Sequence, residues 1–129
     1  MQRAFGAIAL CLCFAAIVDA APPRRSRRPR SIHLTATAYC RDGRTRSGIR
    51  ARSGVIAADP HVLPVGSIVR ILDGPTTGIY TVMDTGSAIK GRRIDVYLPS
   101  CAHAKKFGRR MVTAIVIRRG WNPSAAGEP

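Results

Sequence analysis

Apolar and polar residues alternate over short distances between residues 31 and 118, and glycine, proline and aspartate interrupt the alternation at short intervals. A period of two is typical of β-strands, whose successive side chains face opposite sides of the sheet. One late segment instead begins at a good N-cap, Ser100, and ends at a glycine, Gly108, which predicts a short helix. The expected strands are 31–39, 54–58, 67–72, 78–84, 93–98 and 111–118, and the expected helix is 100–107.

This many short strands in so small a segment favours a closed barrel over a sandwich, because closure removes exposed strand edges. We therefore expect an all-β fold, a six-stranded barrel with one short helix. In the fifth strand, alternation places Ile94, Val96 and Leu98 on one face and Arg93 and Asp95 on the other. Asp95 thus lies in the middle of a strand and points away from its apolar side.

The first 20 residues have the features of a signal peptide, with Arg3 before an apolar stretch at 5–18 and small residues near 20. The stretch is shorter than the roughly 20 apolar residues of a transmembrane helix, and no later segment of the sequence reaches that length. We expect an exported protein, periplasmic or secreted, of unspecified oligomeric state. The expected divisions are a signal peptide at 1–20, a basic disordered linker at 21–31, the barrel domain at 32–120 and a flexible tail at 121–129.

The chain carries a formal net charge of +14, and five arginines are concentrated in the segment Arg24–Arg30. A run without apolar residues is typical of a disordered arm. Nucleic acid could bind such a run, but the export signal argues against that partner. An anionic envelope surface is the expected partner, and a solvated linker without a specific partner is the alternative.

Removal of the signal peptide leaves two cysteines, Cys40 and Cys101. In an exported chain, an even pair predicts a disulfide, with two free thiols as the alternative. The bridge would close a loop of about 60 residues, worth roughly 4 kcal/mol on the chain-entropy model. The histidines at 33 and 103 stand alone, so neither a catalytic cysteine nor a zinc site is indicated. No metal or other cofactor is expected.

Acidic residues are few, and most of the candidate chemistry depends on three of them. Asp42 and Asp73 each precede a glycine, which predicts turns, and Asp73 is expected to be solvated. Asp59, Asp84 and Asp95 remain, each at or within an expected strand.

The tetrapeptide Asp84–Ser87 has the aspartic protease pattern, and single-motif proteases share a carboxylate dyad between two chains. That fold requires a later strand that ends in two apolar residues and a glycine, whereas here two arginines precede Gly120. A calcium or magnesium site built from the three aspartates is a second interpretation. Their spacings match no compact metal loop, and Lys90, Arg92 and Arg93 crowd the region with positive charge.

A third interpretation depends on ordered blocks of sequence: TAYC at 37–40, GVIAADP at 54–60, LPVG at 63–66, DTGSAIKG at 84–91, RIDVY at 93–97 and AKKFG at 104–108. In this order the blocks resemble the three-aspartate (3D) domain of bacterial cell-wall proteins. The resemblance implies a double-psi β-barrel. It also implies kinship with the barrel of membrane-bound lytic transglycosylase A, and hence glycan strands of peptidoglycan as the partner.

In the transglycosylase family, the aspartate that aligns with Asp95 is the catalytic acid/base. One carboxyl group suffices there, because the 6-hydroxyl of the muramic acid attacks its own anomeric carbon and no water needs activation. Asp95 must then start protonated, so we expect burial to raise its pKa. Arg92 and Arg93 would oppose this if they lie close. Asp84 is expected to help through its charge or through a shared proton.

Asp59 is expected to be structural, accepting backbone N–H groups in the turn before Pro60, with a third active-site carboxylate as the alternative. Five further residues are candidates for substrate binding, although each could be an ordinary strand or turn residue. They are Thr37, Tyr39, Thr85, Gly86 and Lys90.

The rival function is that of a non-catalytic barrel that binds or loosens the cell wall, similar to expansin or rare lipoprotein A. The transglycosylase relative has a second domain that forms much of its glycan groove, and 129 residues leave room for only one domain.

Overall fold

The computed structural model describes residues 29–121, so the predicted signal peptide and most of the predicted linker and tail lie outside the described residues. Within them, the predicted strands and helix are confirmed, with ends that differ by at most one residue. They are β1 (Ser31–Tyr39), β2 (Val55–Ala58), β3 (Ile68–Ile71), β4 (Gly78–Asp84), β5 (Arg93–Tyr97), α1 (Cys101–Phe107) and β6 (Arg110–Arg118).

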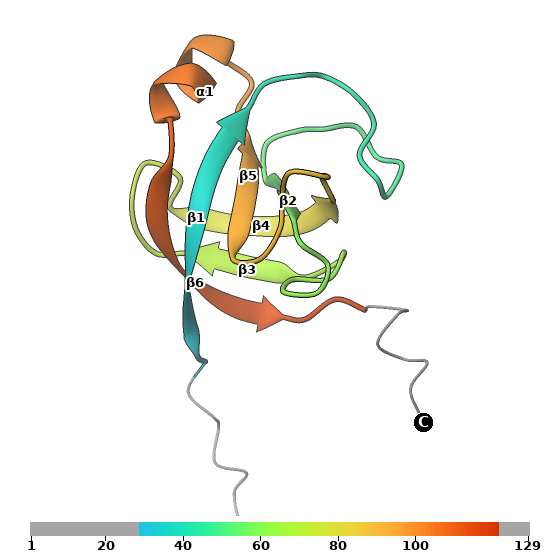
Figure 1. Cartoon of the computed structure of the whole chain (residues 1–129), viewed down its shortest axis with the longest axis vertical. Helices are drawn as coiled ribbons and strands as arrows, with labels where there is room; N and C mark the ends of the chain where they lie inside the picture. The colour runs from blue at the N-terminus through green and yellow to red at the C-terminus, as the bar shows by residue number, and fades with distance from the viewer. Residues whose placement is uncertain (1–28, 122–129) are drawn as a thin grey trace, which may run out of the picture.

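The strands close into a barrel in the order β1-β5-β2-β4-β3-β6. The pairs β1–β5 and β2–β4 are parallel, and the other pairs are antiparallel. Figure 1 shows β1 and β5 running upward across β3 and β4, which lie behind them. Within residues 29–121, the closed six-stranded barrel with one short helix confirms the expected double-psi β-barrel.

The interior is filled by alternate residues of the strands. Leu34 and Ala36 of β1 and Ile94 and Val96 of β5 are fully buried. The same cluster includes Phe107 of α1, Leu63 of the β2–β3 loop and residues of the remaining four strands (Ile56, Ala58, Val69, Ile71, Val82, Val112 and Ala114). Because one face of each strand is committed to this core, the other face is free to carry polar chemistry.

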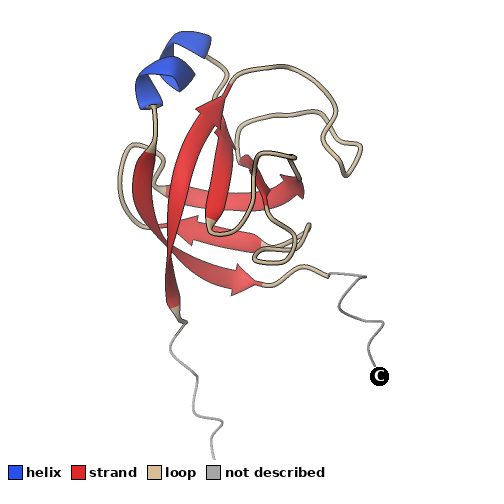
Figure 2. Cartoon of the chain, in the orientation of Figure 1, coloured by secondary structure: helices blue, strands red, loops and turns tan. Residues whose placement is uncertain are grey.

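The short helix α1 lies at one end of the barrel (Figure 2). Its N-cap is Ser100, whose hydroxyl accepts the His103 N–H at 3.3 Å, and it ends at Gly108, which has a φ of 64°. Both ends therefore match the capping pattern read from the sequence. In the described part of the chain, no helix has the length and apolar character needed to cross a membrane.

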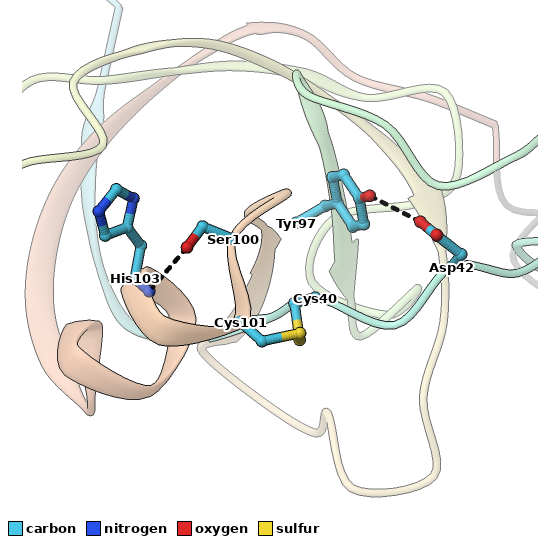
Figure 3. Close-up of a disulfide and its surroundings, with 6 residues drawn as sticks. All are labelled: Cys40, Asp42, Tyr97, Ser100, Cys101 and His103. Atoms are coloured by element: carbon cyan, nitrogen blue, oxygen red, sulfur yellow. Dashed lines mark hydrogen bonds between the residues drawn. A yellow bond between two sulfur atoms is a disulfide. The ribbon is translucent and has the colours of Figure 1, made fainter.

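The predicted disulfide is confirmed. Cys40, immediately after β1, is bonded to Cys101, the first residue of α1, with their Cα atoms 5.0 Å apart. The bond joins positions 61 residues apart. It fixes the helix and the start of the long β1–β2 loop to the same point of the barrel (Figure 3).

Replacing both Cys40 and Cys101 with serine should lower the free energy of unfolding by roughly 4 kcal/mol, because the denatured chain loses a 61-residue closed loop. Urea unfolding of the two proteins, followed by circular dichroism, measures the difference. Equal unfolding midpoints would show that the bridge contributes nothing to stability. The wild type with reductant serves as the control and should resemble the double variant.

Candidate functional site

Four residues form a row across the outer face of the barrel. Thr37 of β1 is paired with Asp95 of β5, Asp95 with Ala57 of β2, and Ala57 with Asp84 of β4. Paired residues project to the same face of a sheet, and the neighbouring positions Ile56, Val82 and Val96 are fully buried in the core. Asp84 and Asp95 are therefore two strands apart, about 10 Å between Cα atoms, with Ala57 of β2 paired to both.

The place of Asp84 in this row depends on an irregularity in the sheet. The β2–β4 register shifts between Ile56 and Ala57, so that Ile56 faces Val82 but Ala57 faces Asp84. Met83 is the additional residue. With regular alternation, Asp84 would project to the same side as Val82, into the core. The bulge turns the carboxylate outward beside Asp95, a use of bulges that is common next to functional sites.

Asp95 is partly buried and holds one direct polar contact, in which the Thr37 hydroxyl donates to Asp95 Oδ1 at 3.0 Å. Burial raises the pKa of Asp95, the Thr37 hydrogen bond lowers it and the charge of Asp84 raises it, with a net upward shift. Arg92 and Arg93 were expected to lower the pKa of Asp95, but neither contributes to the shift. Arg93 instead donates from Nη1 to the Ala88 carbonyl at 3.1 Å, so its charge is directed toward the β4–β5 loop.

The Thr37 hydroxyl can serve both protonation states of Asp95. It lies 3.0 Å from Asp95 Oδ1 and 3.4 Å from the Ile94 carbonyl oxygen. Toward an ionised Asp95 it donates. When Asp95 is protonated, the Thr37 oxygen can accept a hydrogen bond from the carboxylic acid and donate its own proton to the Ile94 carbonyl oxygen. A hydroxyl can do both because it is a donor and an acceptor. The contact therefore suits a carboxyl group that gains and loses a proton.

Tyr39 lies on the same outer face as Thr37, two residues further along β1. Its ring packs edge-on against Tyr97, with centroids 5.5 Å apart, and its buried hydroxyl has no hydrogen-bond partner among the described residues. Burial and then the charges of Asp84 and Asp95 raise the pKa of Tyr39 to about 12. The hydroxyl is thus a neutral, buried group whose pKa is affected by both carboxylates.

The sequence reasoning did not identify the contact between Tyr97 and Asp42. Tyr97 is buried although it shares the outer face with Asp95, and its hydroxyl donates to Asp42 Oδ1 at 2.8 Å (Figure 3). This hydrogen bond is the main cause of the raised pKa of Tyr97. Asp42 is therefore more than a turn residue, because it holds the start of the β1–β2 loop over the end of β5.

Asp84 holds the same loop at a second point. Asp84 Oδ1 accepts the backbone N–H of Arg46 and that of Thr85, each at 2.8 Å. The N–H of Ser47 also donates to the Met83 carbonyl at 3.2 Å. Among the described contacts, no hydrogen bond joins Asp84 to Asp95, so Asp84 acts on Asp95 through its charge and not through a shared proton.

Comparison with known proteins identifies the family of the chain. Residues 54–118, about half of it, match the family model of the 3D domain. The chain belongs to the 3D domain family. This confirms the family resemblance seen in the sequence.

Two relatives from Bacillus subtilis (strain 168) are similar to this 3D domain. The cell wall-binding protein YocH is 38% identical over 97 residues, covering 68% of this chain and 33% of YocH. The putative cell wall shaping protein YabE is 40% identical over 91 residues, covering 67% of this chain and 22% of YabE. The chain thus spans a third or less of the length of these curated relatives.

Among solved structures, an expansin variant from Clavibacter michiganensis in complex with cellohexaose matches the 3D domain with a TM-score of 0.52 at 15% identity, covering 73% of this chain and 54% of the expansin. MltA from E. coli with bound chitohexaose has a TM-score of 0.48 at 19% identity and covers 61% of this chain and 28% of MltA. The expansin match shows a shared fold.

Asp59 of the 3D domain is buried, with 7% of its surface exposed. Its Oδ1 accepts the His61 N–H at 3.0 Å and its Oδ2 accepts the Gly91 N–H at 2.7 Å. These bonds, the Gly91 bond first, lower the pKa of Asp59. The carboxylate joins the turn after β2 to the β4–β5 loop, which fits a structural role.

The β4–β5 loop contains the other predicted binding residues. Thr85 donates its N–H to Asp84. A Cβ at Gly86 would lie 2.9 Å from the Ile89 side chain, so a larger residue there would force Ile89 to move. Lys90 is exposed, and its charge contributes to the lowered pKa of Asp59 and not to that of Asp95. The structure therefore brings Thr85 to the row but does not bring Lys90 to Asp95.

Neither a metal-binding cluster nor the cavity described below involves the row of carboxylates in the part of the chain that the structure describes. No group of three or more histidine, cysteine or acidic residues among residues 29–121 could hold a metal ion. A cavity of about 410 Å³ contains none of the three aspartates, so it is separate from this chemistry. It is lined by Pro75, Thr76, Leu98, His103, Lys106, Phe107 and Arg110.

Thr37→Val should raise the pKa of Asp95 further, because it removes the hydrogen bond that lowers this pKa without changing side-chain volume. Carboxyl-carbon NMR titration measures the shift. Thr35→Val is the matched control on the same face of β1, since Thr35 contacts Met111 and not an acid. An unchanged or lower Asp95 pKa in Thr37→Val would contradict the described contact.

Asp59→Asn should destabilise the domain at neutral pH. The amide has one oxygen, so it cannot accept the N–H groups of both His61 and Gly91 as the two carboxylate oxygens do. A carboxylate whose folded pKa is lowered stabilises the protein above its unfolded pKa, and the effect disappears as pH falls through the folded pKa. The gap between wild-type and variant urea midpoints should therefore narrow on acidification. Lys105→Gln, an exposed α1 position whose charge is not among the causes of the lowered Asp59 pKa, should show little change. A gap that is constant across pH would rule out this role for the Asp59 carboxylate.

Proposed function

We propose that this 3D domain protein is exported and acts on peptidoglycan as a lytic transglycosylase. It cleaves the bond between N-acetylmuramic acid and N-acetylglucosamine and leaves 1,6-anhydro ends. One observation supports this above the others: a half-buried carboxyl group, Asp95, has a raised pKa and a hydroxyl partner suited to both of its protonation states. Family membership and the names of YocH and YabE support the cell wall as the place of action.

In the proposed reaction, protonated Asp95 donates its proton to the glycosidic oxygen as the bond to the muramic acid C1 breaks. The 6-hydroxyl of the same muramic acid attacks C1, and its proton passes to the Asp95 carboxylate. The acid is thereby restored, and no water is consumed. A single carboxyl group can perform both transfers, whereas glycoside hydrolysis usually needs two.

The neighbouring residues have supporting roles in this scheme. The negative charge of Asp84 keeps Asp95 protonated to a higher pH and faces the positive charge that develops at C1. The neutral Tyr39 hydroxyl adds no charge beside the two carboxylates. Thr37 orients Asp95, while Thr85 and Gly86 shape the loop beside Asp84.

A second candidate function is a non-catalytic barrel that binds or loosens the wall. It is favoured by the relative named as a cell wall-binding protein. Under both functions, residues 1–20 act as the export signal, and the arginines of Arg24–Arg30 meet an anionic envelope surface.

Asp95→Asn should abolish the release of anhydro-muropeptides from purified sacculi, while binding to the sacculi remains. Mass spectrometry of the products and a pull-down measure the two properties. Asp73→Asn is the matched control. Asp73 lies on a turn outside the row, where it accepts the N–H of Thr113 in β6. Wild-type release should also decline as pH rises through the elevated pKa of Asp95, since the protonated form is required.

Continued release by Asp95→Asn would refute the catalytic assignment. Binding by the wild type without any product would favour the wall-binding function instead.

A further inference from the structure

The loop between β1 and β2 is strongly basic. Residues 41–53 include five arginines and a single acid, Asp42. All five arginines are exposed, and Asp42 is engaged by the Tyr97 hydroxyl. The arginines are Arg41, Arg44, Arg46, Arg50 and Arg52.

Residues 43–51 of this loop form a small hairpin, called here the arginine hairpin. Thr45 N–H donates to the Ile49 carbonyl at 2.8 Å, and Ala51 N–H donates to the Gly43 carbonyl at 2.9 Å. Arg44 and Arg50 are directly opposite each other in an antiparallel bridge. Side chains in that relation share one face at about 5 Å, and like charges there are destabilising. An anionic ligand between the two arginines would relieve this repulsion.

The hairpin is held beside the row of carboxylates. Its tip is bound through the backbone, by Arg46 N–H to Asp84 and by Ser47 N–H to Met83. In Figure 1 the loop leaves the top of β1 and turns back near the arrowhead of β4 before it enters β2. Its start is fixed by the Asp42–Tyr97 hydrogen bond next to the disulfide (Figure 3). Arg44 also donates from Nη1 to the Gly48 carbonyl within the hairpin at 3.0 Å. Because the other anchors use backbone atoms and Asp42, the guanidinium groups of Arg41, Arg46, Arg50 and Arg52 have no side-chain hydrogen bond among the described contacts.

We propose that the arginine hairpin binds the carboxylates of the peptides that branch from the glycan strand. The protein then recognises peptide-bearing peptidoglycan in preference to bare glycan. This inference rests on the proposed function, which places a glycan along the row that ends at Asp84. The peptides of that glycan are attached to its muramic acid residues, so their carboxylates lie within reach of the hairpin. Guanidinium groups match carboxylates with paired hydrogen bonds.

The test compares the full chain with Arg44→Gln/Arg50→Gln in binding to two forms of sacculi, both freed of other wall polymers. One form keeps its peptides, and the other has been stripped of them by an amidase. The double variant should bind the peptide-bearing form about 2- to 30-fold more weakly, the range for two exposed charge pairs. It should bind the stripped form as the wild type does, and added salt should reduce the difference between wild type and variant on the peptide-bearing form.

Arg70→Gln/Arg118→Gln is the matched control. It removes the same charge from β3 and β6, which do not contribute to the row. Equal losses on both forms of sacculi, an equal loss in the control, or no loss at all would overturn the proposal. A loss seen only when phosphate-containing wall polymers are restored would overturn it too, by identifying those polymers as the ligand. Asp95→Asn, assayed for products, reports on the proposed function separately.

Discussion

The bulge between β2 and β4 is the constraint on which the candidate site depends. One additional residue, Met83, separates the part of β4 that faces the core from the part that faces outward. Val82 can therefore fill the interior while Asp84, two positions later, joins Asp95 on the surface. Without the shift, a carboxylate would enter the apolar core, where it would have to be neutralised or paired.

The β1–β2 loop completes the surroundings of this row. Three interactions hold it in place: the disulfide at Cys40, the hydrogen bond from the Tyr97 hydroxyl to Asp42, and the hydrogen bond from the Arg46 N–H to Asp84. Tyr39 and Tyr97 are thereby held on an outer face that a bare barrel would leave open to water. Burial is the largest cause of the raised pKa of both Asp95 and Tyr39, and the charge of Asp84 adds to it in each case.

Much of the fold could be predicted from sequence because its signals are local. Alternation identified every strand, and Ser100 and Gly108 identified the ends of the helix. Alternation also showed that Asp95 faces away from the core. The outward position of Asp84 could not be predicted, because a bulge depends on the pairing of two strands and leaves no pattern in either one.

Long-range contacts and side-chain directions account for the remaining differences. Asp73 was expected to be only a solvated turn residue, yet it accepts the Thr113 N–H from β6. Arg93 shares a face with Asp95, but its guanidinium binds the Ala88 carbonyl. Sequence proximity therefore overstated its influence on the acid.

The protonation state of Asp95 is central to the proposed chemistry, and a direct titration measures it. The pKa of its carboxyl group, followed by carbon NMR in the wild-type protein and in Asp84→Asn, should lie above the ordinary aspartate value of about 3.9 and should fall when the Asp84 charge is removed. A wild-type value at or below the ordinary one, unchanged in Asp84→Asn, would contradict a protonated acid held beside a second carboxylate.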